Sequence, residues 1–118
     1  MDETLSPREG IRKKKDFLLI YKEGRRYKGK YFNLIYLSNN LSFSRIAIVV
    51  SRKTGNAVKR NKIKRWMRDL FRRNKELLKS SVDIVIFPKK DILELSWSSL
   101  QQEYFAAIEF ISQKTKYP

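Results

Sequence analysis

Lysine and arginine side chains gather in residues 52–79, and they are the side chains of this sequence best suited to bind phosphate. Twelve basic residues lie there, against two acidic ones, Asp69 and Glu76. Planar guanidinium groups donate paired hydrogen bonds to phosphate oxygens, and ammonium groups add point charges. A helix face that is merely solvated usually mixes both signs of charge. The segment therefore indicates contact with a polyphosphate such as nucleic acid.

A helix over this segment would separate its apolar and basic residues onto opposite sides. At 3.6 residues per turn, one face collects apolar side chains that can pack onto a core. That face holds Ile63, Met67, Leu70, Phe71 and Leu78. The opposite arc holds Arg60, Asn61, Lys64, Arg65, Arg68 and Arg72. Since no carboxylate interrupts the arc between Arg60 and Arg68, we expect a continuous cationic surface.

The side chains that most often perform catalysis in proteins are missing or scattered. The sequence has no histidine and no cysteine, and therefore lacks the commonest general base, the commonest zinc ligand and any thiolate. We expect no catalytic residue and no metal ligand in the protein. An alternative is a metal-dependent nuclease that uses carboxylates such as Asp16, Asp69 or Asp83. Arginines near Asp69 explain that residue more simply as a charge partner.

Composition predicts one folded domain over residues 1–118, with residues 1–11 as a flexible tail. The 42% of hydrophobic residues can fill one core. The net charge of +15 favours polyanions and predicts salt-dependent association. The apolar run 17–21 is too short to span a membrane, and we expect neither a membrane nor a small-molecule partner. The absence of cysteine fits a cytoplasmic protein.

Periodicity and turn residues predict the elements that hold the basic helix. The expected order is helix, two strands, basic helix, strand and helix, over residues 16–23, 31–37, 45–50, 57–78, 82–87 and 96–112. Asp16 and Asn56 are the expected N-caps of the first two helices. The turn 38–40 predicts that strands 31–37 and 45–50 pair antiparallel, and the apolar run 46–50 predicts a central strand.

Residues 51–71, SRKTGNAVKRNKIKRWMRDLF, resemble the signature of the bacterial ribonuclease P protein subunit. Asp16-Phe17 with Tyr21-Lys22 and Gly24 resembles the first helix of that family, and Tyr36 and the strand DIVIF, 83–87, also match. The resemblance implies a four-stranded α+β two-layer sandwich, similar to a ribosomal-protein domain. It also implies a left-handed βαβ crossover through the basic helix, against the usual handedness.

The resemblance also implies a function. The family assists a catalytic RNA in removing the 5′ leader of precursor tRNA, and the RNA subunit and substrate hold the Mg²⁺ ions that serve the chemistry. The implied partners are ribonuclease P RNA and precursor tRNA. The alternative is a general RNA-binding or ribosome-associated protein without a role in cleavage, which would explain the charge but not the Gly55-Asn56 cap followed by Arg60-Asn61.

Two sets of site residues follow from the resemblance. The set expected to bind the RNA subunit is Arg52, Lys53, Asn56, Arg60, Asn61, Lys62, Lys64, Arg65 and Arg68. Lys62 stands where the family has arginine, so it keeps the charge but loses the bidentate fork. Phe17, Tyr21 and Tyr36 are expected to line a cleft for the single-stranded leader, where aromatic rings can stack on bases. Ordinary core packing is the alternative for these three.

Overall fold

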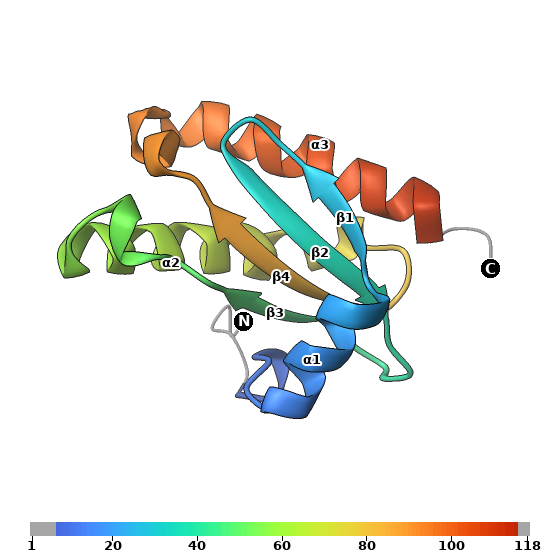
Figure 1. Ribbon diagram of the computed structural model, residues 1–118. Helices are drawn as coiled ribbons and strands as arrows, with labels where there is room; N and C mark the ends of the chain where they lie inside the picture. The colour runs from blue at the N-terminus through green and yellow to red at the C-terminus, as the bar shows by residue number, and fades with distance from the viewer. Residues whose placement is uncertain (1–6, 116–118) are drawn as a thin grey trace.

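The structure is a computed structural model that describes residues 7–115 (Figure 1). The helices are α1 (Lys14–Glu23), α2 (Ala57–Arg73) and α3 (Trp97–Thr115). The strands are β1 (Arg25–Lys28), β2 (Phe32–Ser38), β3 (Arg45–Ile48) and β4 (Val82–Pro88). Short 3-10 helices are η1 (Pro7–Glu9), η2 (Arg52–Thr54), η3 (Lys75–Leu77) and η4 (Lys90–Glu94). The predicted α+β fold is confirmed. Within the described residues, no helix is both long and apolar enough to cross a bilayer.

The four strands form one mixed sheet in the order β1-β2-β4-β3. β2 pairs antiparallel with β1 and β4, and β3 pairs parallel with β4 after the crossover through α2. The predicted pairing of β2 with β3 is wrong, because β4 lies between them. The predicted central position of β3 is also wrong. Its free edge is partly covered by a bridge between Gly10 and Ile46, which explains why an edge strand is so apolar.

The two faces of the sheet carry separate clusters of apolar side chains. Phe32, Leu34 and Tyr36 of β2 point into the larger core beneath α2 and α3. Ile35 of β2 points to the other face, where it packs with Ile20 of α1. Figure 1 shows α1 on the side of the sheet opposite to α2 and α3. The predicted two layers are therefore the sheet with α2 and α3, and α1 adds a short helix on the second face.

The helix ends depart from the sequence-based prediction at two places. α1 begins at Lys14, with Lys13 at the N-cap position, so the prediction that Asp16 caps this helix is wrong. α2 ends at Arg73, five residues before the predicted end. The Asn74 side chain there donates a 2.9 Å hydrogen bond to the Leu70 carbonyl. This bond satisfies one of the free carbonyls at the end of the helix.

Residues 7–11 pack against the domain, so the prediction of a flexible tail is wrong for this part of the chain. Ile11 is buried, and its N–H donates a 3.0 Å hydrogen bond to the Ile46 carbonyl. The buried Glu9 carboxylate lies 2.7 Å from the Lys75 ammonium group. The rest of the predicted tail, residues 1–6, lies outside the described residues.

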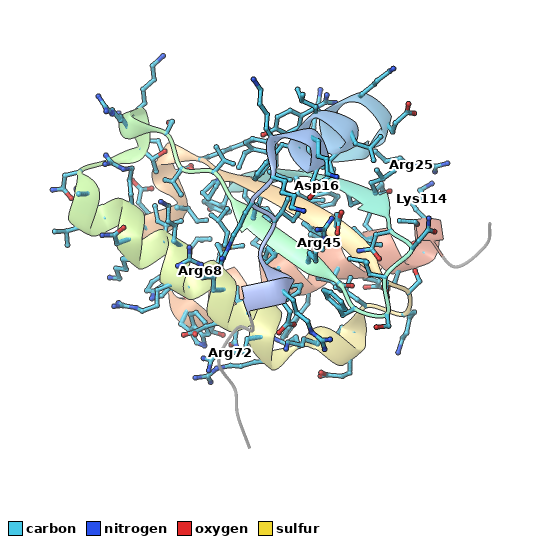
Figure 2. The ribbon with its side chains drawn as sticks, turned by 90° about the horizontal axis from the view of Figure 1, so that it is seen from below. Asp16, Arg25, Arg45, Arg68, Arg72 and Lys114 are labelled. Atoms are coloured by element: carbon cyan, nitrogen blue, oxygen red, sulfur yellow. The ribbon has the colours of Figure 1, made fainter. Side chains whose placement is uncertain are left out.

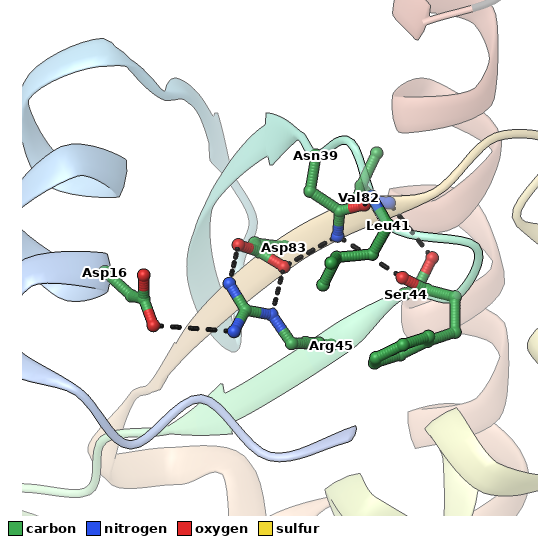
Figure 3. A network of polar contacts seen from close by, with 8 residues as sticks. Asp16, Asn39, Leu41, Ser44, Arg45, Val82 and Asp83 are labelled. Atoms are coloured by element: carbon green, nitrogen blue, oxygen red, sulfur yellow. Dashed lines mark hydrogen bonds and ion pairs between the residues drawn. The ribbon is translucent and has the colours of Figure 1, made fainter. Parts of the chain in front are cut away.

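A network of ion pairs joins α1 to β3 and β4 (Figure 3). Arg45 donates to both carboxylate oxygens of Asp83, at 2.9 and 2.6 Å. Its third nitrogen lies 3.4 Å from Asp16. Asn39 donates a further 2.8 Å hydrogen bond to Asp83. Hydrogen bonding to Asp83 is the main cause that raises the pKa of Arg45 above its usual value. Asp16 therefore anchors its helix to the sheet instead of capping it.

Candidate nucleic-acid interface

The start of α2 is fixed by the residues that the sequence singled out. Asn56 accepts a 3.0 Å hydrogen bond from the Lys59 N–H, which confirms the predicted N-cap. Arg60 donates a 2.8 Å hydrogen bond back to the Gly55 carbonyl. This bond holds the loop that carries Arg52 and Lys53 against the first turn of the helix.

α2 presents its basic residues to solvent because its apolar stripe is anchored in the core. Ile63, Met67, Leu70 and Phe71 are all buried, as predicted, whereas Leu78 lies beyond the helix and is half-buried. The predicted binding residues Arg52, Lys53, Asn56, Asn61, Lys62, Arg65 and Arg68 are exposed, and Arg60 and Lys64 are half-buried. We call these nine residues the α2 face. The structure thus brings the whole predicted set together along one helix and the loop before it.

Besides Arg60, the basic side chains of Lys62 and Arg72 on α2 have partners within the protein. The Lys62 ammonium group lies 4.9 Å from the centre of the Trp66 ring, which in turn packs edge-on against Trp97. Arg72 pairs with Asp69 at 2.5 Å. Figure 2 shows Arg72 one turn beyond Arg68 on α2. Arg72 is thus tied to an acid of its own helix.

Further lysines lie near the loop before α2 and were missed by the sequence analysis. Lys59, Lys89 and Lys90 line a surface hollow of about 600 Å³, together with Thr54, Leu93 and the acidic residues Asp91 and Glu94. The Lys89 ammonium group donates to the Gly29 carbonyl at 2.7 Å. The only signal for this extension was the pair of lysines after Pro88. Their distance from the basic helix in sequence concealed their proximity in space.

A cavity of about 550 Å³ lies on the α1 side of the sheet, and we call it the α1 cleft. It is lined by Tyr21, Arg26, Tyr27, Lys28, Asn33, Leu34, Ile35 and Phe87. Tyr21 of α1 and Phe87 of β4 are aromatic residues of this lining. Phe17, which was predicted to line the cleft, is not a lining residue and packs against the smaller apolar cluster beside Tyr21. The rings of Phe17 and Tyr21 are 6.1 Å apart, and those of Tyr21 and Phe87 are 6.2 Å apart. Tyr21 is 38% exposed, so its ring is open to a ligand.

Tyr36 does not belong to the α1 cleft, and the prediction that it shares a cleft with Phe17 and Tyr21 is wrong. Its side chain is 2% exposed and lies on the opposite face of the sheet. There its ring meets Phe110 of α3 edge-on, 6.3 Å between centres. Burial raises the pKa of the Tyr36 hydroxyl, and the nearby Arg25 charge partly opposes this shift. The β2 side chains that point to the cleft are those of Ile35 and Asn33, which lie on the strand face opposite to Tyr36.

Each carboxylate of the nuclease alternative is paired with an arginine of the protein. Asp16 and Asp83 share the Arg45 guanidinium, and Asp69 pairs with Arg72 on another element. In residues 7–115, no three acidic side chains gather in a group that could hold a metal ion.

Comparison with known proteins identifies the family. The ribonuclease P family model matches residues 5–111. The chain belongs to the ribonuclease P protein family. It is 47% identical over 94 residues to the ribonuclease P protein component of Thermotoga maritima, covering 80% of each chain. It is 42% identical over 100 residues to that of Syntrophus aciditrophicus, covering 85% of this chain and 84% of the other.

Solved structures of ribonuclease P proteins share the fold. The Thermotoga maritima protein superposes with a TM-score of 0.78 at 38% identity, over 85% of this chain and 94% of the other. The Staphylococcus aureus protein superposes with a TM-score of 0.79 at 30% identity, over 87% of this chain and 94% of the other. This ribonuclease P protein is therefore a subunit of the endoribonuclease that processes tRNA, and its function is exercised together with RNA.

Proposed function

We propose that this ribonuclease P protein binds the catalytic RNA subunit through the α2 face and the 5′ leader of precursor tRNA in the α1 cleft. The hydrolysis is performed by the RNA, and the protein is a non-catalytic subunit. Mg²⁺ ions are held mainly by the RNA subunit and substrate. The complex works in the cytoplasm.

The observation that carries this proposal is the continuous cationic surface of α2. From Arg60 to Arg68 no acid interrupts it, and the buried stripe of the helix fixes the direction in which the cations point. Guanidinium and ammonium groups held in this way match the phosphates of a folded RNA without reading its bases. The proposal includes all nine residues of the α2 face.

The α1 cleft supports the second part of the proposal. Bases of an unpaired strand can stack on Tyr21 and Phe87, whereas paired bases offer no free ring face to them. A leader that runs through this cleft would pass the Tyr21 ring of α1 and the Phe87 ring of β4, whose centres lie 6.2 Å apart. Tyr36 has no part in it, because its ring is enclosed by the core.

A cleavage assay on precursor tRNA tests the proposal with three samples: the chain alone, ribonuclease P RNA alone, and both together. We expect no mature 5′ ends from the chain alone and more efficient cleavage by the complex than by the RNA alone. Mature ends produced by the RNA-free chain would contradict the non-catalytic role. Equal cleavage with and without the chain would contradict a role in substrate binding.

A further inference from the structure

β1 forms the wall of the α1 cleft opposite the aromatic rings, and this wall is basic. In the β1–β2 register Arg26 lies opposite Ile35, and Lys28 lies opposite Asn33. Directly paired residues of antiparallel strands point to the same face of a sheet. Arg26 and Lys28 therefore point to the α1 side, and both line the cavity.

Arg26 and Lys28 are exposed, and neither has an acidic partner within residues 7–115. The basic residues Arg45 and Arg72, in contrast, are occupied by carboxylates of the protein. Two free cations beside the aromatic rings of Tyr21 and Phe87 provide both groups that bind an unpaired nucleic-acid strand, namely charges for the backbone and rings for the bases.

The spacing of the two cations also suits a nucleic-acid backbone. Residues two apart on a strand are separated by about 7 Å. This is close to the distance between successive phosphates of an extended strand. Because β1 is an edge strand, nothing of the sheet lies beyond this wall to block the path of a backbone.

We infer that Arg26 and Lys28 bind two successive phosphates of the unpaired leader, while its bases turn toward Tyr21 and Phe87. β1 is then a phosphate track that fixes the position of the leader backbone in the cleft. The inference rests on the proposed function, because it assigns to the leader a path within the same cleft. It adds a binding role for a strand that the sequence did not reveal.

The test uses the complex of the full chain with ribonuclease P RNA and compares precursor tRNA with tRNA that lacks a leader. The variants are Arg26→Gln, Lys28→Gln and the double change. The matched control is Arg25→Gln, which removes the same charge from the neighbouring residue. Arg25 lies opposite Tyr36 and so points to the α3 side. Figure 2 shows it at the same end of the molecule as Lys114 of α3.

We expect the double variant to bind precursor tRNA about fivefold more weakly, the size expected for two exposed charge contacts. Binding of leaderless tRNA should not change. The magnitude of the log–log salt slope for precursor tRNA should fall by about 1.4, which corresponds to two single-strand phosphates. A leader with neutral methylphosphonate linkages at the contacted positions should remove the difference between wild type and double variant.

The other possible results show whether the phosphate track on β1 or the proposed leader binding in the cleft is wrong. If Arg25→Gln and Arg26→Gln weaken the binding of precursor tRNA equally, the effect comes from the overall positive charge of the protein. The phosphate track is then wrong. If the double variant binds like wild type while wild type still prefers the leader, the cleft holds the leader without β1. If wild type itself shows no preference for the leader, the proposed function fails in its leader-binding part.

Discussion

Tyr21 and Tyr36 show how the position of one side chain decides between binding and packing. Tyr21 follows Phe17 by one helical turn and opens into the α1 cleft. Tyr36 sits on the strand that forms the floor of the same cleft, but its ring points away from it. Alternation along β2 places Tyr36 on the same face as Phe32 and Leu34. It could not reveal which of the two faces α1 covers, because that depends on contacts between distant segments.

We predict that Tyr36→Ala lowers stability without changing tRNA selectivity, whereas Tyr21→Ala weakens leader binding without changing stability. Tyr36→Ala should lower the free energy of unfolding by roughly 3 to 5 kcal/mol, because a large buried ring is lost. The folded variant, measured at low temperature, should bind precursor and mature tRNA in the same ratio as wild type. Tyr21→Ala should leave stability nearly unchanged and weaken the binding of precursor tRNA by about 1 to 3 kcal/mol. Urea unfolding and two binding measurements check both variants. If Tyr36→Ala weakened the binding of precursor tRNA but not of mature tRNA, Tyr36 would belong to the leader site after all.

At the scale of elements, α2 was the easiest to predict and the sheet the hardest. The 3.6-residue period, the Gly55-Asn56 start and the buried stripe are local features of the sequence. β1 was missed because it has four residues, mostly exposed, without apolar alternation. β3 was predicted to be central because it is apolar on both faces, but its outer edge is instead covered by residues 10–11. Strand order depends on pairing across long stretches of chain, which local patterns do not record.

The Arg45 network joins α1 to β3 and β4, and a second prediction tests how much it stabilises the fold. Arg45→Met should lower the free energy of unfolding by about 3 to 5 kcal/mol, because the Asp83 carboxylate would remain buried without a cation. The Asp83 side chain is 7% exposed. Asp16→Asn should cost less than about 1 kcal/mol, since Asp16 is more exposed and lies 3.4 Å from Arg45.

A double variant distinguishes a buried charge from lost packing as the cause. Arg45→Met combined with Asp83→Leu leaves no charge in the network, so it should recover part of the stability lost in Arg45→Met. Chemical denaturation of the four proteins, including wild type, measures the coupling between the two sites. No recovery would mean that the Arg45 side chain stabilises the fold mainly through its packing.

At the scale of the whole molecule, the charge that serves RNA binding acts against folding. The net charge is +15, and the α2 face concentrates many of these cations within a Debye length of one another. The sequence alone predicted this excess and its position on the basic helix. It could not predict that Arg26 and Lys28 of β1 lie beside the α1 cleft, or that Lys89 and Lys90 lie beside Lys59 together with Asp91 and Glu94, because only the fold brings these residues together.

Arg68→Gln should therefore stabilise the free chain while it weakens binding to ribonuclease P RNA. Lys64, Arg65 and Arg72 lie three or four residues from Arg68, so their like charges repel it on the helix surface. The glutamine variant should gain roughly 0.5 kcal/mol at low salt, and thus melt a few degrees higher. The gain should disappear at about 1 M salt, where the Debye length is only about 3 Å. Its RNA affinity should have a salt slope smaller in magnitude by about 0.7 to 0.9.

The matched control is Arg72→Gln, which removes the same charge one turn further along α2. Because Arg72 is paired with Asp69, its loss should not stabilise the free chain at any salt concentration. Melting curves across a salt series, with and without the RNA, compare the two variants directly. If Arg68→Gln lowers the melting temperature of the free chain at low salt, Arg68 stabilises the fold through contacts of its own. The opposition between folding and RNA binding would then not apply at this position.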